Sequence, residues 1–89
     1  MSREALERLA GTYVMEGGGF KLLLEVTEEG LLGTFGENEI SRMVPLTPLR
    51  FKIDGEPPGR YWDFVEEGGE IRALEMVHGG NAQVRLTRQ

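Results

Sequence analysis

The 89-residue chain has no cysteine, one histidine (His78) and two serines, Ser2 and Ser41. Without cysteine there is no disulfide and no thiolate nucleophile. A lone histidine without Cys, Asp or Glu at ligand spacing does not make a zinc or iron site. No glycine-framed elbow surrounds Ser41, so a catalytic Ser41–His78 pair is only a remote alternative. We therefore expect no bound metal, no cofactor and no catalytic residue.

Positive charge and long apolar runs are also scarce. Ten Lys and Arg residues stand against fifteen Asp and Glu residues, for a net charge of −5. The basic residues are scattered singly, which disfavours nucleic acid and anionic membrane surfaces as partners. No apolar run approaches the roughly 20 residues that span a bilayer. The segment Met1–Glu4 has no leader pattern, and the localisation is left open.

Glycine, in contrast, is abundant, and its positions are the most informative feature of the chain. Of thirteen glycines, only Gly11 and Gly33 fall outside seven turn-like breaks. The breaks are Gly17–Gly19, Glu29–Gly30, Gly36–Asn38, Pro45–Pro48, Asp54–Gly59, Gly68–Gly69 and Gly79–Gly80. Tight hairpins need residues that accept positive φ, so this spacing predicts an antiparallel meander.

Between the breaks the apolar residues recur with a period of two, which is typical of strands. In the clearest run, Phe20, Leu22, Leu24 and Val26 share one face. The predicted strands are Thr12–Glu16, Phe20–Thr27, Leu31–Phe35, Glu39–Val44, Leu49–Ile53, Tyr61–Glu66, Ile71–His78 and Asn81–Thr87. The seventh is ambiguous because its centre could be helical, but flanking glycine pairs and β-branched neighbours favour a strand.

A short helix is expected before the first strand, over about residues 3–10. Ser2 can cap its free amides, Glu4 suits its first turn, and Gly11 is a candidate C′ residue. The whole chain, 1–89, then forms one domain with strands within 12–87. Its predicted fold is all-β: a small eight-stranded antiparallel up-and-down barrel with a short N-terminal helix, its interior mostly filled and a shallow pocket at the mouth.

Aromatic and thioether side chains are the candidate ligand contacts, although in so small a chain they more often form the core. The residues predicted to bind a ligand are Tyr13, Phe35, Phe51, Trp62, Phe64 and Met76. Asp63 and Glu75 are the best candidates for buried carboxylates. The favoured interpretation places them outward, paired with Arg60, Arg72 or Arg85 across strands.

Short motifs along the chain resemble a known family. Leu9–Tyr13 resembles the "aGtY" opening of the lipocalin-like β-barrel domains found at the C-terminus of serine β-lactamase-like and penicillin-binding-protein-like hydrolases. The further matches are Leu22–Val26 with Glu28–Leu31, Val44–Phe51, and Trp62–Phe64 leading through Gly69–Ile71 to Leu74. The resemblance implies an accessory barrel with no catalytic residue of its own, because the nucleophilic Ser and Lys belong to the hydrolase domain.

Two function classes follow from the sequence. The first is a non-catalytic accessory or binding module that holds a small apolar ligand in the barrel mouth. The second is a structural or oligomerisation domain with a filled barrel, which packs on a hydrolase domain or forms a homo-oligomer. A hydrolase or isomerase that works through Asp63, Glu75 or His78 is a distant third. A solvent-connected cavity would favour the first class, and an exposed apolar strip on the outer wall the second.

Overall fold

The computed structural model, described for residues 1–37 and 39–89, is an eight-stranded antiparallel barrel with one short helix, as the sequence predicts. Asn38, which belongs to the predicted break Gly36–Asn38, lies outside the described residues. The elements are α1 (Arg3–Glu7), β1 (Gly11–Met15), β2 (Lys21–Thr27), β3 (Gly30–Phe35), β4 (Glu39–Pro45), β5 (Arg50–Ile53), β6 (Arg60–Glu67), β7 (Glu70–His78) and β8 (Asn81–Arg88).

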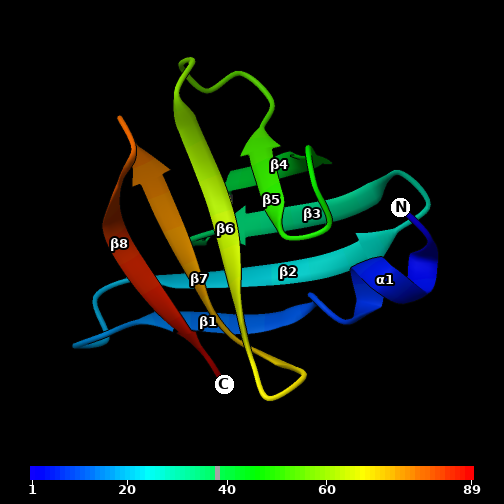
Figure 1. Ribbon diagram of the computed structural model, residues 1–89, viewed down its shortest axis with the longest axis horizontal. Coiled ribbons are helices and arrows are strands. Elements are labelled where there is room, and N and C mark those ends of the chain that lie inside the picture. The colour runs from blue at the N-terminus through cyan, green and yellow to red at the C-terminus, as the bar shows by residue number, and fades with distance from the viewer. Residues whose placement is uncertain (38) are drawn as a thin grey trace.

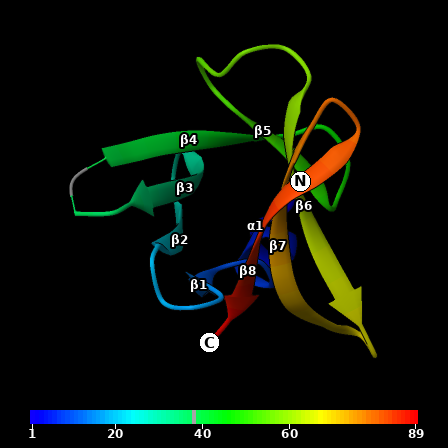
Figure 2. The ribbon, with the colours of Figure 1, turned by 90° about the vertical axis from the view of Figure 1, so that its left-hand side faces the viewer.

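Each strand pairs with the next, and β1 closes the barrel by pairing with β8. In Figure 1, β1 to β3 run across the view while β6 to β8 cross it steeply, and Figure 2 shows the hairpins splayed around one interior. The closing seam is short: Tyr13 lies opposite Arg88, and Met15 lies opposite Leu86. Closure removes the open sheet edges that eight short strands would otherwise expose.

The helix is shorter than the predicted span 3–10, and Gly11 is not its C′ residue. Ser2 caps α1 as expected, accepting from the amide of Ala5, but the helix ends with Arg8 as its C-cap. Gly11 instead begins β1 with φ of 140°. A Cβ there would lie 3.3 Å from Nε of Arg88, so the guanidinium of Arg88 occupies the space that a side chain would need.

The ambiguous seventh run is a strand, and a bulge explains its pattern. Val65 pairs with Ala73 but Glu66 pairs with Ile71, so the ladder passes over Arg72. The extra residue lets Ile71 and Leu74, which differ in parity, both join the core.

The core is densely packed at the end of the barrel that α1 covers. Leu6 and Leu9 are buried and dock the helix on the strands. Behind them the ring of Phe64 meets Tyr13 and Phe51 in edge-to-face contacts, with centroids 5.9 and 5.4 Å apart. The predicted filling of the barrel therefore holds for this end.

Candidate functional site

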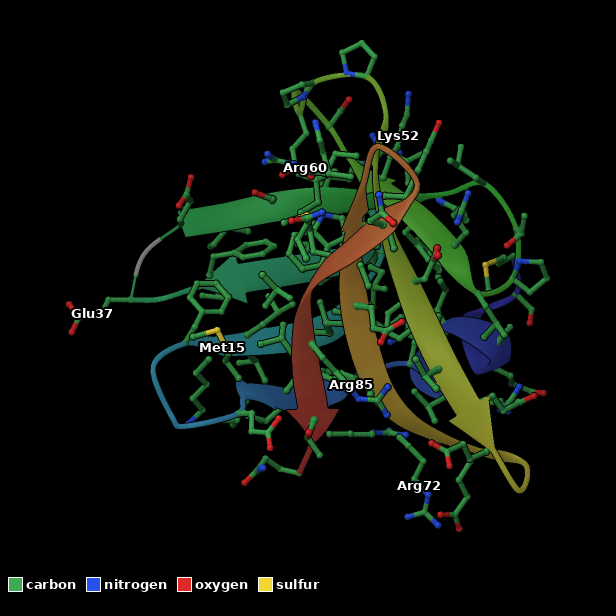
Figure 3. All side chains as sticks on the ribbon, turned by 60° about the vertical axis from the view of Figure 1, so that its left-hand side comes forward. Met15, Glu37, Lys52, Arg60, Arg72 and Arg85 are labelled. Atoms are coloured by element: carbon green, nitrogen blue, oxygen red, sulfur yellow. The ribbon has the colours of Figure 1, made fainter. Side chains whose placement is uncertain are left out.

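A cavity of about 680 Å³ opens at the end of the barrel opposite α1. It lies where β1, β3 and β5 end and where β4 and β6 begin, beneath the loop 54–59. In Figure 3, Met15 and Arg60 lie on the side of the molecule away from the helix. The lining residues are Met15, Gly19, Phe20, Phe35, Glu39, Ser41, Ile53, Asp54, Gly55, Glu56, Arg60, Trp62, Met76, Val84 and Leu86.

Three aromatic rings form one wall of this cavity. Phe35 lies 6.0 Å from Phe20 and 5.5 Å from Trp62, measured between ring centroids, and its contact with Trp62 is edge-to-face. Met15, Met76 and the aliphatic side chains of β8 supply further apolar surface. The wall is adaptable as well as apolar, because thioether side chains fill irregular shapes.

Two small residues on neighbouring strands give the surrounding core side chains room to pack. Gly33 of β3 pairs with Ser41 of β4, and the same side of β3 carries the inward-facing Leu31 and Phe35. A Cβ on Gly33 would lie 3.2 Å from side-chain atoms of both Leu24 and Phe35. A larger residue would therefore displace the surrounding side chains, and this explains a glycine outside the turns.

A polar group made of Glu56, Arg60 and Trp62 borders the cavity. The carboxylate of Glu56 accepts from Nε1 of Trp62 at 2.8 Å and from Nη1 of Arg60 at 3.2 Å. The carboxylate therefore fixes the indole and ties the loop 54–59 to β6. Nε of Arg60 is buried and has no hydrogen-bond partner among the described residues.

The structure separates the six predicted ligand contacts into two groups of three. Phe35, Trp62 and Met76 line the cavity. Tyr13, Phe51 and Phe64 belong instead to the packed end of the barrel. Ligand binding by any of the six stays a prediction. Sequence reasoning missed Glu56 and Arg60 as cavity residues, because their common position depends on how the loops converge.

The residues considered for acid–base chemistry lie on the outer wall or near a turn. Asp63 accepts two hydrogen bonds from Arg50, at 2.7 and 2.8 Å, rather than from the arginines named in the sequence analysis. Glu75 accepts from Arg85 across β7 and β8, as expected. His78 is exposed beside the β7–β8 turn. In the part of the chain that the structure describes, no three His, Cys, Asp or Glu side chains group as a metal site.

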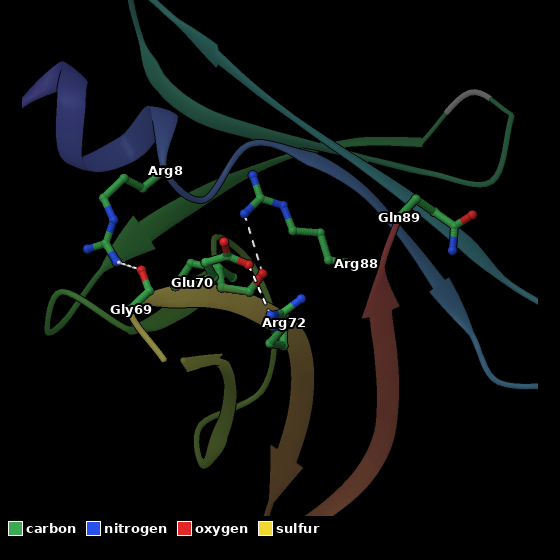
Figure 4. Close-up of a pocket in the computed structure, with 7 residues that line it drawn as sticks. Arg8, Gly69, Glu70, Arg72, Arg88 and Gln89 are labelled. Carbon is green, nitrogen blue, oxygen red and sulfur yellow. Dashed lines mark hydrogen bonds and ion pairs between the residues drawn. The ribbon is translucent and has the colours of Figure 1, made fainter. Parts of the chain in front are cut away.

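A second cavity, of about 540 Å³, lies near the closed end and is bordered by three arginines, Arg8, Arg72 and Arg88. Figure 4 shows them beside two of their partners, the backbone oxygen of Gly69, which accepts from Arg8 at 3.3 Å, and the carboxylate of Glu70. Arg8 pairs with Glu66, and Arg72 pairs with Glu70 at 3.1 Å. Arg88 donates to backbone oxygens, at 2.6 Å to Ala10 and at 3.4 Å to Ile71. The contacts of Arg8 and Arg88 join the segment around the helix to the sheet at this cavity.

Tyr13 makes the other tie between the helix segment and the barrel. Its hydroxyl donates to the carbonyl of Leu9 at 2.7 Å. Burial raises the pKa of Tyr13 to about 12, and the positive charge of Arg88 opposes this shift in part. The hydroxyl thus stays protonated and keeps its hydrogen bond to Leu9, which joins the segment after the helix to β1.

No protein-family model, curated protein or solved structure matches the chain. Among the residues that the structure describes, no helix is long and apolar enough to cross a membrane. The fold and the two ends of the barrel are therefore the basis for inferring a function.

Proposed function

We propose that the protein is a non-catalytic binding module that holds a small apolar molecule in the open end of its barrel. The observation that carries this proposal is the cavity of about 680 Å³, whose wall is formed by Phe20, Phe35 and Trp62. Ligand sites of known proteins typically have volumes of about 300–1,000 Å³ and are lined mainly by apolar and aromatic side chains.

The packed end of the barrel supports the same proposal. Tyr13, Phe51 and Leu74 are fully buried at the packed end of the barrel, below the cavity. The helix α1 closes the barrel at this packed end. A rigid base lets the open end stay formed without a ligand, so binding does not have to order the barrel.

A neutral fluorescent probe tests this function directly. N-phenyl-1-naphthylamine brightens in apolar surroundings and should bind the purified chain with one site per barrel. Val84→Phe places a large ring in the cavity and should weaken binding at least tenfold. Val14→Phe adds the same ring on β1, at a position that faces away from the interior because it directly follows the inward Tyr13. This variant should bind the probe as the wild type does.

Equal binding by the two variants, or no binding by the wild type, would contradict the proposal. Native mass spectrometry of the same samples gives the ligand stoichiometry and the oligomeric state together. Circular dichroism and thermal melting confirm that both phenylalanine variants are folded before their affinities are compared.

A second candidate function is assembly through the outer wall. Leu23 lies opposite Thr34, which lies opposite Ile40, so these residues form one row across β2, β3 and β4. Leu23 and Ile40 are 37% and 65% exposed, unlike the other large apolar residues of these strands. If this row mediates self-association, native mass spectra will show dimers that Ile40→Glu abolishes.

The motif at Leu9–Tyr13 supports a proposal about the larger protein in which the barrel works. We infer from it that the barrel is a lipocalin-like accessory domain that packs on a hydrolase domain. Co-purification with such a domain would be lost in Ile40→Glu if the outer wall is the contact surface, and kept if another face is used.

A further inference from the structure

If the proposed binding function holds, the polar groups that line the open cavity indicate the chemical class of its ligand. Trp62 and Arg60 have the same parity on β6, so the guanidinium of Arg60 extends toward the inside at the barrel mouth. Its side chain is 34% exposed, and Glu56 is its one ion-pair partner among the described residues.

The two edges of this guanidinium differ. Nη1 donates to Glu56, while Nε is buried and has no acceptor among the described residues. A buried donor without a partner is costly, because it has lost its water and gained nothing in exchange. Nε is closed to water in this conformation. The inference therefore requires the guanidinium, whose side chain is partly exposed, to turn before an acceptor can reach Nε.

The charges around the cavity decide what kind of acceptor fits. Among the described residues, three carboxylates line it, from Glu39, Asp54 and Glu56, against the one cation Arg60. Glu56 already compensates Arg60, so a ligand carboxylate would add a fourth negative charge without a free cation to meet it. A carbonyl oxygen has two lone pairs and no net charge, so it can accept from Nε without this repulsion.

We infer that the cavity takes an uncharged apolar molecule that carries a carbonyl group, as in a ketone, an ester or an amide. Its apolar body packs on the wall of Phe20, Phe35 and Trp62, and its oxygen accepts from the free edge of Arg60. Anionic amphiphiles are disfavoured by Glu39 and Asp54.

Four probes of nearly the same shape test the inference: 4-phenylbutan-2-one, butylbenzene, 3-phenylpropanoate and 4-phenylbutan-2-amine. Isothermal titration calorimetry should rank the ketone about tenfold tighter than the hydrocarbon, the difference expected for one hydrogen bond to a charged donor. The carboxylate should bind more weakly than the ketone. In ¹⁵N NMR spectra, the Nε–H signal of Arg60 should move with the ketone and stay in place with butylbenzene.

Arg60→Lys separates charge from geometry, because lysine keeps the cation near Glu56 but has a methylene at the Nε position. Its affinity for the ketone should fall to the level of the hydrocarbon, whereas its affinity for butylbenzene should not change. Arg42→Lys is the matched control, since Arg42 is exposed and has the parity opposite to the buried Met43 of β4.

Each other outcome overturns the inference. A ketone no tighter than butylbenzene, with both bound, removes the role of Arg60 and leaves the binding function intact. Tightest binding of the carboxylate refutes the argument from charge, and tightest binding of the amine refutes the assignment of a hydrogen-bond acceptor to the ligand. Failure of all four probes to bind the wild type overturns the binding function together with the inference.

Discussion

Replacing one phenylalanine at each end of the barrel tests the division into a packed base and a hollow mouth. Phe51 is fully buried against Phe64, while Phe35 is half-buried and borders the cavity. Phe51→Ala should lower the free energy of unfolding by about 3–5 kcal/mol, because it removes buried surface and leaves a void. Phe35→Ala should cost about 2 kcal/mol, because it enlarges a space that is already open and loses only part of the buried area.

Urea unfolding followed by circular dichroism measures both losses on one scale. A domain of this size has a total stability of about 5–15 kcal/mol, so Phe51→Ala could be only marginally folded. Phe51→Leu and Phe35→Leu form a milder pair with the same expected order. The slope of free energy against urea should stay constant, which shows that the unfolding reaction is unchanged.

Equal losses for the two sites would refute the reasoning. So would a larger loss at Phe35 than at Phe51. Either result would mean that the open end is as well packed as the closed end, and the cavity would then lose its place as the candidate site.

Three further predictions concern single residues at the two ends. Because burial raises the pKa of Tyr13 above its ordinary 10.0 to about 12, stability is full below pH 10 and is lost toward pH 12. Urea unfolding should show a loss of about 2–3 kcal/mol that Tyr13→Phe does not share. Gly33→Ala should lower the free energy of unfolding by about 1–3 kcal/mol through overpacking, whereas the outward Thr34→Ala should lower it by less than about 1 kcal/mol. Equal shifts in melting temperature for the two variants would contradict this. Glu56→Ala should shift the emission of Trp62, the single tryptophan, to longer wavelength, whereas Glu56→Gln keeps an acceptor and the wild-type spectrum.

The strands and their order could be predicted because the signals are local. Glycine pairs such as Gly68–Gly69 and Gly79–Gly80 adopt positive φ at hairpin turns, and the runs between them alternate. Alternation tells which residues face inward. The ambiguity at Ile71–His78 could be resolved in favour of a strand, but the bulge at Arg72 could not be foreseen, since it depends on the pairing of β6 with β7.

The candidate site could be predicted only in part. Aromatic residues point inward from both ends of the barrel, and their parity does not tell which of them meet packing partners. Phe64 is enclosed because Tyr13 and Phe51 converge on it, whereas Phe35 borders open space. Gly11 likewise has no local explanation, because its neighbour Arg88 lies at the far end of the chain.

The two chain termini lie on the side of the barrel that the helix covers. The helix α1 precedes the start of β1, and the amide of Gln89 donates to the carbonyl of Thr12 at that same start. Figure 1 marks both ends away from the loop that joins β5 to β6. A linker, a solid support or a fused enzyme attached at either terminus would thus hold the barrel by its packed end. The open end would then face outward.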